Sequence, residues 1–259
     1  MIATLQYDQL VVEVHESNTA LGQAAASTFA HVVQHAVQAQ GEAAVILATG
    51  NSQRTFIEAI ADHPEIPWDH ITVFHMDEYI GMSTEHPASF YGFMHQRIAE
   101  VFHPKALFGI HGDAPNIDAE LRRYTDLLLE HHPVITVMGI GENGHLAFND
   151  PPADFHTPDL IHVVTLDEIC RRQQVGEGHF HSLDEVPAQA MSLTIPALLK
   201  SQHVLTLVPE ARKAEAVRAA LLDPVSEYCP ASILRTQAHV RLLLDPDSAG
   251  LLHYDQIEN

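Results

Sequence analysis

The chain has 259 residues, of which 46% are hydrophobic, and a formal net charge of −21 from 13 basic and 34 acidic residues. This length suits one α/β domain, with or without a small lid, and the apolar fraction is sufficient for a sizeable core. The negative charge disfavours nucleic acid and anionic membranes as partners, so any phosphate site must be locally positive. No apolar run approaches the roughly 18 residues of a membrane span, and the N-terminus lacks the pattern of a secretory signal.

The cysteines and histidines give no motif for a metal or a disulfide framework. Cys170 and Cys229 are far apart and outside any CxxC pattern, which fits a reducing cytoplasm. The chain has 20 histidines, and adjacent ones such as His131–His132 could bind a metal, but no HExxH or clustered Cys/His pattern supports this. We therefore predict a cytoplasmic protein without a bound metal.

Segments typical of strands and of helices alternate along the chain. Short apolar runs predict buried strands at Ala43–Ala48, Ile71–Phe74, Ile135–Met138, Val204–Leu207 and Val240–Leu244. Helices are predicted between them at Thr19–Gln38, Gln53–Ala61, Ser89–Val101, Asp118–Glu130 and Lys213–Leu222. This alternation predicts a doubly wound, mostly parallel sheet with helices on both faces, a Rossmann-like three-layer sandwich. Ligands of such sheets bind beyond the carboxyl ends of the strands.

The first such strand end is Thr49-Gly50-Asn51-Ser52. Gly50 permits a tight turn, and backbone N–H groups at the start of the following helix can bind a phosphate. Thr49 and Ser52 add hydroxyl donors. The alternative is an ordinary helix start in which Asn51 or Ser52 is the N-cap residue.

The second strand end carries two adjacent acids, Asp77 and Glu78. Because alternate side chains of an extended segment point to opposite faces, the two carboxyls are expected to have different roles. One carboxyl could act as a general base and the other could hold the surrounding structure in place. The alternative is that the segment is a solvated loop that caps the next helix.

The third strand end is the glycine-rich segment from Gly139 to Pro151. His145 suits proton transfer near neutral pH, and the nearby Asp150 can orient it. Gly139, Gly141 and Gly144 also match the GxGxxG spacing of dinucleotide sites. Against a dinucleotide site, the glycines lie in mid-chain, and His145 and Asp150 stand where that motif requires a helix.

Two strings resemble the signature segments of one family. FHMDEYIGMSTEHPASFYGFM and GIGENGHLAFNDP resemble those of glucosamine-6-phosphate deaminases, and ATGNS is similar to the phosphate loop of that family. KAEAVRAALL and PASIL extend the likeness, which spans about residues 43 to 245. The related 6-phosphogluconolactonases typically have DER where this chain has Asp77-Glu78-Tyr79.

The resemblance implies a reaction and assigns roles to residues. Members of the family open the ring of glucosamine 6-phosphate, move a proton between C2 and C1, and release ammonia to give fructose 6-phosphate. By analogy, Asp77 is the base for the C2 proton, His145 serves in ring opening, and Asp150 supports His145. The candidate catalytic residues are Asp77, Glu78, Asn143, His145 and Asp150, and the candidate substrate-binding residues are Thr49, Gly50, Asn51, Ser52, Gly144 and Lys213. No cofactor is expected, because the substrate carbonyl or imine is its own electron sink.

The chain departs from the family pattern at three places. Asn143 replaces an aspartate of one well-known branch, and Asp150 stands where the family usually has the longer glutamate. The arginine that usually binds phosphate is missing from CRRQQVGEGHFHSL, where Gly178 or His179 takes its position. Loss of a bidentate guanidinium weakens phosphate recognition, so the sequence leaves open a substrate that differs from glucosamine 6-phosphate in stereochemistry or in its phosphate.

Three functions remain compatible with the sequence. The first is an amino-sugar-phosphate deaminase/isomerase acting on a small phosphorylated amino sugar, with residues 1–259 as one domain. The second is another sugar-phosphate enzyme, such as a lactonase or a non-deaminating isomerase, and the third is a non-catalytic sugar-phosphate sensor. The intact Asp77, His145 and Asp150 favour an enzyme. The choice between monomer and homo-oligomer stays open.

Overall fold

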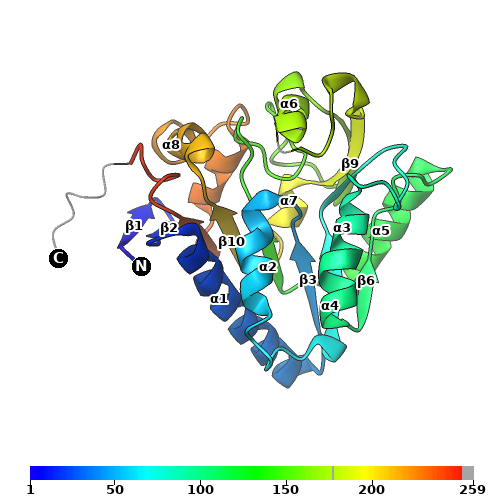
Figure 1. The fold of residues 1–259 in the computed structure, drawn as a ribbon, viewed down its shortest axis with the longest axis horizontal. Coiled ribbons are helices and arrows are strands. Elements are labelled where there is room, and N and C mark those ends of the chain that lie inside the picture. Colours follow the sequence, from blue (N-terminus) through cyan, green and yellow to red (C-terminus); the bar gives the residue numbers. More distant parts are fainter. Residues whose placement is uncertain (177, 253–259) are drawn as a thin grey trace.

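A computed structural model describes residues 1–176 and 178–252 (Figure 1). Its strands are β1 (Ala3–Tyr7), β2 (Leu10–Val14), β3 (Ala43–Leu47), β4 (Ile71–His75), β5 (Asp77–Tyr79), β6 (Ala106–Phe108), β7 (Ile135–Met138), β8 (Ile161–Thr165), β9 (Gln189–Leu193), β10 (His203–Val208) and β11 (Val240–Leu244). Its helices are α1 (Asn18–Gln40), α2 (Arg54–Ile60), α3 (Phe90–Met94), α4 (Glu100–Phe102), α5 (Ile117–His131), α6 (Glu168–Gly176), α7 (Ile195–Leu198) and α8 (Ala214–Leu222). None of the helices in these ranges is long and apolar enough to cross a membrane.

The main sheet has the strand order β1-β2-β11-β10-β7-β3-β4-β6. The strands from β2 to β6 in this order pair in parallel, and β1 adds an antiparallel edge strand. From β3 the chain runs outward through β4 and β6, and then returns to the other side of β3 as β7. The order therefore reverses between β3 and β7, which is where doubly wound sheets bind ligands.

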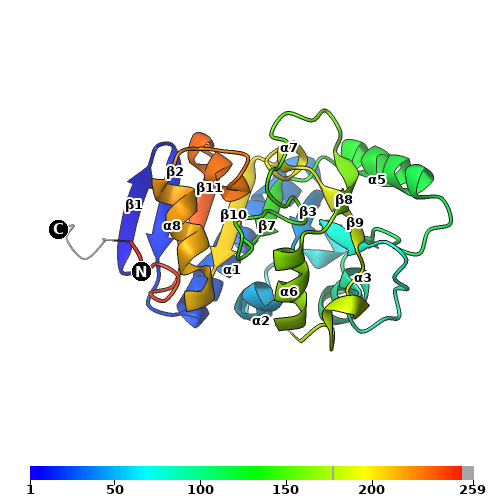
Figure 2. The same cartoon turned by 90° about the horizontal axis from the view of Figure 1, so that it is seen from above.

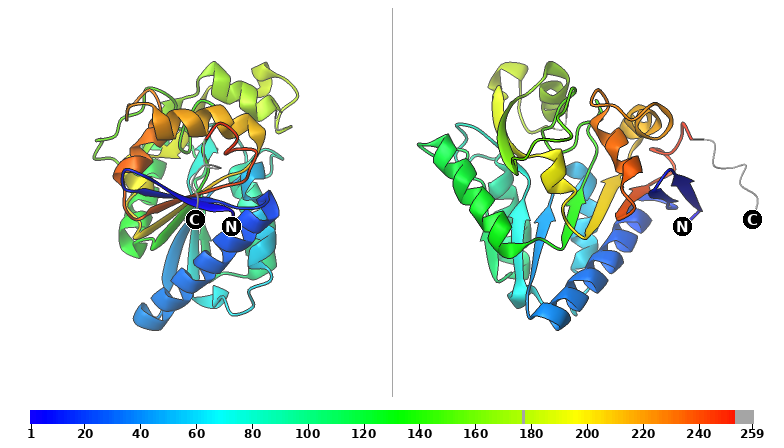
Figure 3. Two further views of the ribbon diagram at one scale, coloured as in Figure 1. Left: turned by 90° about the vertical axis from the view of Figure 1, so that its left-hand side faces the viewer. Right: turned by 180° about the vertical axis from the view of Figure 1, so that it is seen from behind.

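Both faces of the main sheet are buried. Along β3, Ala44 and Ile46 belong to one core with α5 and α8, whereas Val45 and Leu47 belong to a second core with α1 and α2. Figure 3 shows α1 and α8 on opposite sides of the sheet, and Figure 2 shows β1 and β2 at one edge of the molecule. This arrangement confirms the predicted doubly wound three-layer fold.

The ends of α1 show how the sequence sets a boundary. Ser17 is the N-cap residue, and its Oγ accepts a hydrogen bond of 3.1 Å from the backbone N–H of Ala20. The helix stops at Gly41, which has φ = 84° in the left-handed region that glycine adopts without steric cost.

The predicted elements are found, and further elements appear that the sequence analysis did not predict. The predicted strands are confirmed to within one residue at each end. The predicted helix Ser89–Val101 is interrupted by a π-helical turn at His95–Ala99 between α3 and α4. The hairpin of β1 and β2, strand β6, and a second sheet with the order β5-β9-β8 were not predicted. That residues 1–259 form a single domain stays a prediction.

The second sheet and α6 lie at the carboxyl end of the main sheet. Strand β5 pairs antiparallel with β9 and begins at Asp77, directly after β4. Helix α6 and helix α8 both lie at the same end in Figure 1. Together these elements position the segments that follow β3, β4, β7 and β10.

Candidate active site

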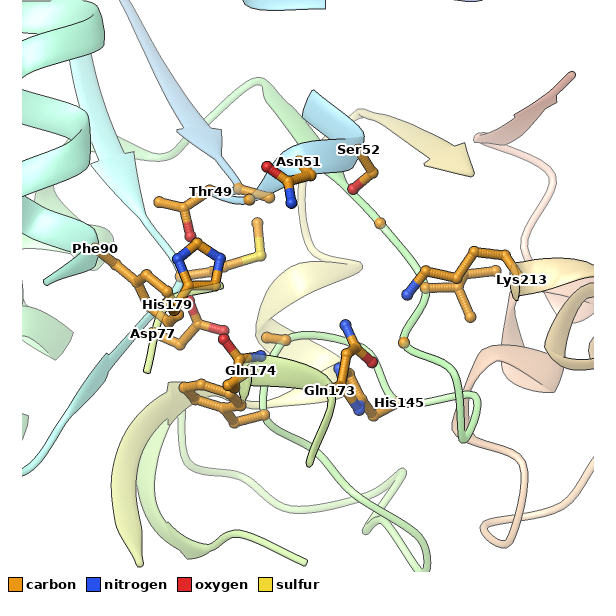
Figure 4. A pocket seen from close by; sticks show the side chains of 18 residues that line it. Thr49, Asn51, Ser52, Asp77, Phe90, His145, Gln173, Gln174, His179 and Lys213 are labelled. Atoms are coloured by element: carbon orange, nitrogen blue, oxygen red, sulfur yellow. The ribbon is translucent and has the colours of Figure 1, made fainter. Parts of the chain in front are cut away.

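A pocket lies where four neighbouring strands of the main sheet, β10, β7, β3 and β4, end. Figure 4 shows its lining from close by. The lining residues are Ala48, Thr49, Gly50, Asn51, Ser52, Met76, Asp77, Phe90, Gly139, Ile140, Gly141, His145, Ala147, Phe148, Gln173, Gln174, His179 and Lys213. The structure thus brings together the three strand ends singled out from the sequence, with Lys213 from the segment after β10.

One side of the pocket suits an anion. Gly50 has φ = 96° and ψ = 173°, so the chain turns sharply from β3 into the 3₁₀ turn Asn51–Gln53 that precedes α2. Within the described part of the chain, no side chain caps this turn or α2, so the simple helix-cap interpretation of Asn51 and Ser52 is wrong. Both residues line the pocket instead.

Lys213 supplies positive charge on this side. Lys213 is only 3% exposed. It lies at the start of α8, where the sequence predicted the helix to begin. In Figure 4 its side chain reaches into the pocket from the side opposite Asp77. In a chain of net charge −21, this lysine is a basic group that an anionic ligand of the pocket would need.

Asp77 lines the pocket through an almost fully buried carboxyl group. Burial, and then the charge of Glu78, raise the pKa of Asp77 to about 8. A carboxyl group with a pKa near neutrality is a stronger base than an ordinary aspartate and can still be ionised at working pH.

Glu78 points away from the pocket, as expected for the next residue of an extended segment. Its carboxylate accepts hydrogen bonds from Ser89 Oγ (2.8 Å) and from the backbone N–H groups of Tyr91 (2.9 Å) and Phe90 (3.3 Å), at the start of α3. Glu78 is therefore not among the residues that line the pocket, and its catalytic role stays a prediction.

His145 faces the pocket on the loop after β7. A Cβ atom at Gly141 would lie only 2.2 Å from the imidazole, so only glycine leaves room for this ring. The Nδ1 of His145 lies 3.1 Å from Oδ1 of Asp150, close enough for an ion pair but not aligned as a hydrogen bond. Catalytic contacts are often poorly aligned before substrate binds.

Asp150 is held behind His145 by a network of donors. Asn143 Nδ2 donates to Asp150 Oδ1 (2.9 Å) and to Asp167 Oδ2 (3.0 Å), and the backbone N–H of Asp167 donates to Asp150 Oδ2 (3.0 Å). Burial opposes ionisation of Asp150, but its contacts with His145, Asn143 and Asp167 outweigh burial and hold its pKa below the usual value. An aspartate at position 143 would replace both donors with a like charge.

Two further residues of the candidate set lie outside the pocket lining. Gly144 has φ = 84°, and its carbonyl accepts a hydrogen bond from the N–H of Ala231, so it shapes the loop, and its substrate-binding role stays a prediction. Asn143 acts through Asp150. The loop from Gly139 to Asp150 leads to β8 without opening a helix, which removes the dinucleotide alternative.

The structure adds pocket residues that the sequence analysis did not identify. Phe90 and Phe148 form apolar walls, and Gln173 and Gln174 reach the pocket from α6. His179, one of the two residues at the expected place of the arginine, also lines the pocket. Arg171 instead donates to the carbonyls of Leu183 and Val186.

The second nearby arginine does not replace the missing guanidinium either. Arg172 pairs with Glu168 on the exposed side of α6. Neither arginine belongs to the pocket lining.

The fold and the pocket define an α/β protein whose ligand site lies at the carboxyl ends of a doubly wound sheet. Residues 16–243 match the family model of glucosamine-6-phosphate isomerases/6-phosphogluconolactonase. The chain is 33% identical over 214 residues to the glucosamine-6-phosphate deaminase of Streptococcus pyogenes serotype M1, covering 83% of this chain and 89% of the relative. It is 34% identical over 228 residues to glucosamine-6-phosphate deaminase 1 of Bacillus subtilis, covering 86% of this chain and 93% of the relative.

Solved structures agree with the sequence matches. A monomeric glucosamine-6-phosphate deaminase superposes with a TM-score of 0.84 at 32% identity, covering 93% of this chain and 99% of that one. A 6-phosphogluconolactonase from Trypanosoma brucei superposes with a TM-score of 0.74 at 18% identity, covering 96% and 100%, and shares the fold. The chain therefore belongs to the family of glucosamine-6-phosphate isomerases and 6-phosphogluconolactonases.

Proposed function

We propose that this protein is an amino-sugar-phosphate deaminase/isomerase that converts glucosamine 6-phosphate, or an epimer of it, to a ketose 6-phosphate and ammonia. The observation that carries the proposal is that Asp77 and His145 line the same pocket as a candidate phosphate site. This candidate site, which we call the anion corner, consists of Thr49–Ser52 and Lys213. The deaminase relatives at about one third identity support this activity over lactone hydrolysis.

The anion corner holds the phosphate. Thr49 to Ser52 offer backbone N–H and hydroxyl donors, and Lys213 adds a charge-assisted hydrogen bond. A phosphate fixed there orients the sugar so that its reacting carbons lie between the acid and base groups, which lowers the entropic part of the barrier.

The acid–base groups act in sequence on the sugar. His145, supported by the ionised Asp150, takes the proton of the C1 hydroxyl and gives one to the ring oxygen, which opens the ring. Asp77 then takes the proton from C2 and returns it to C1. The imine that forms at C2 is hydrolysed, so one water is consumed and ammonia leaves. Each well-placed group contributes about 10²–10⁴ in rate.

An assay of ammonia release tests the proposal and resolves the epimer. Glucosamine, galactosamine and mannosamine 6-phosphates are compared with 6-phosphogluconolactone, with the Asp77→Asn protein as a control for contaminating activity. We expect ammonia and a ketose 6-phosphate from one amino sugar at a rate that depends on Asp77. Hydrolysis of the lactone, without ammonia from any of the three sugars, would contradict the proposal.

A further inference from the structure

Three side chains of types that can bind a metal lie together beside the pocket, and the reaction above uses only two of them. It consists of His145, Asp150 and Cys170, and one ligand atom of each lies within 4.8 Å of the other two. His145 and Asp150 come from the loop after β7, and Cys170 comes from the first turns of α6. We refer to these three side chains as the His-Asp-Cys cluster.

The cluster is enclosed rather than exposed. Cys170 is 0% exposed and His145 is 7% exposed. The cluster is therefore not a chance grouping of solvent-exposed side chains. The helix start is fixed as well, because the backbone N–H of Cys170 donates a hydrogen bond of 2.6 Å to Asp167 Oδ1. The thiol therefore stays next to Asp150, within 4.8 Å of one of its carboxylate oxygens.

The donor set fits one class of cation. A nitrogen, a carboxylate oxygen and a sulfur suit Zn²⁺, whose ligand distances of about 2.0–2.3 Å place tetrahedral ligands roughly 3.3–3.8 Å apart. From their present separations the three donors would need to approach by only about 1 Å. His145 also lines the pocket, so a fourth position would open toward the substrate space.

We infer that the His-Asp-Cys cluster is an inhibitory binding site for a thiophilic divalent cation, with Zn²⁺ as the best fit. The cation replaces the thiol proton, which passes to solvent, and takes the His145 and Asp150 side chains as its other ligands. A cation held there removes the pair that the proposed function assigns to ring opening, so occupancy and turnover exclude each other. The inhibitory consequence rests on that function, but the binding site does not.

The sequence patterns did not reveal this site, because its ligands come from two segments about twenty residues apart that fit no zinc motif. The sequence patterns predicted a protein without a bound metal, and the proposed site departs from that prediction. An inhibitory cation is compatible with a cofactor-free reaction, and it makes a different prediction about added metal.

Binding of Co²⁺ to the metal-stripped protein tests the site independently of any activity. Tetrahedral Co²⁺ with a thiolate ligand gives a sulfur-to-cobalt charge-transfer band, which cobalt bound to surface histidines does not give. We expect this band in the native protein and in Cys229→Ser, its loss in Cys170→Ser, and its disappearance when Zn²⁺ is added. Cys229 is the matched control, because it is the second of the two cysteines and lies outside the cluster.

A second variant keeps the test decisive if Cys170→Ser does not fold. Asp150→Asn keeps the thiol and weakens one ligand, so the band should persist while the Co²⁺ affinity falls by about 10-fold or more. In the activity assay, Zn²⁺ should inhibit the native protein, a chelator should reverse the inhibition, and Cys170→Ser should need more than about 100-fold more Zn²⁺. A native protein without the band, or a band lost only in Cys229→Ser, overturns the assignment.

Discussion

Asp77 and Asp150 are the same residue type on two sides of one pocket, and their surroundings shift their pKa values in opposite directions. Asp77 is buried next to a second acid, which raises its pKa to about 8. Asp150 is also buried, but His145, Asn143 and the backbone N–H of Asp167 stabilise its ionised form.

The difference between the two acids lies in the groups around each carboxyl. Burial disfavours the charge of either one, and Glu78 adds to this effect at Asp77, whereas His145 and the donors from Asn143 and Asp167 outweigh it at Asp150. A raised pKa suits a group that must take and return a proton, whereas a lowered pKa suits one that must stay ionised beside a histidine. The opposite pKa shifts therefore support the proposed roles, proton transfer for Asp77 and support of His145 for Asp150.

The largest expected effect is the loss of turnover in Asp77→Asn. The amide keeps the shape of the side chain but cannot take the C2 proton, so kcat should fall by at least about 10² while KM changes little. Steady-state ammonia release measures both constants. Asp69→Asn, at an exposed acid, is the control. Near-normal turnover in Asp77→Asn would remove this residue from the role of base.

His145→Gln should separate ring opening from proton transfer. Glutamine keeps polar contacts but cannot shuttle protons, so we expect a loss of about 10² or more on the closed-ring substrate. An analogue that is already open should lose much less, since it bypasses the step. Equal losses on the two compounds would mean that His145 serves binding or folding instead.

Lys213→Met should weaken binding of the phosphorylated sugar. A charge-assisted hydrogen bond contributes about 1.5–3 kcal/mol, so KM should rise by roughly 10-fold or more. Added salt should weaken substrate binding less in this variant, because the screened charge is gone. Lys200→Met removes an equal charge from an exposed position and is the matched control. An unchanged KM would leave the Thr49–Ser52 loop to bind phosphate without this lysine.

The smallest effect is on stability, and its sign differs between the two acids. Because the folded-state pKa of Asp77 is raised from 3.8 to about 8, its native state favours the proton and the stability of the protein falls as pH rises between these values. Asp77→Asn should therefore melt at a higher temperature than the native protein above pH 8, by at least about 2 °C. The gain should vanish near pH 4.

The contrasting variant is Asp150→Asn. The lowered pKa of Asp150 contributes stability that is present above its unfolded value and is lost as pH falls through the folded value. The variant should melt below the native protein at neutral pH, and the deficit should shrink in acid. Thermal unfolding of both variants across pH checks the pair, and changes of the same sign at pH 8 would contradict the comparison.

The sequence predicted the core of the fold because its central strands are continuous apolar runs. Strands β7 and β11 begin and end at the predicted residues. The second sheet was missed because β5 has only three residues and β8 has a single buried residue, Ile161. Short strands that gain stability from tertiary pairing carry little local signal.

The sequence could predict those site residues that directly follow a strand. Asp77, His145 and the Thr49–Ser52 loop lie at adjacent strand ends, where parallel sheets bind ligands. The opposite orientations of Asp77 and Glu78 followed from the extended segment, but the hydrogen bonds of Glu78 at the start of α3 could not be read from sequence spacing. The proximity of Cys170 to Asp150 depends on how α6 packs over the loop, and no spacing rule gives that contact.

The opposite tuning of the two acids is tested most directly by ¹³C NMR of the side-chain carboxyl groups in aspartate-labelled protein. The account predicts one resonance that titrates near pH 8 and is missing from Asp77→Asn. It predicts a second that stays ionised to a lower pH than an ordinary aspartate and is missing from Asp150→Asn. Titration of the Asp77 resonance near its ordinary value of 3.8, or shifts of both resonances in the same direction, would contradict the account.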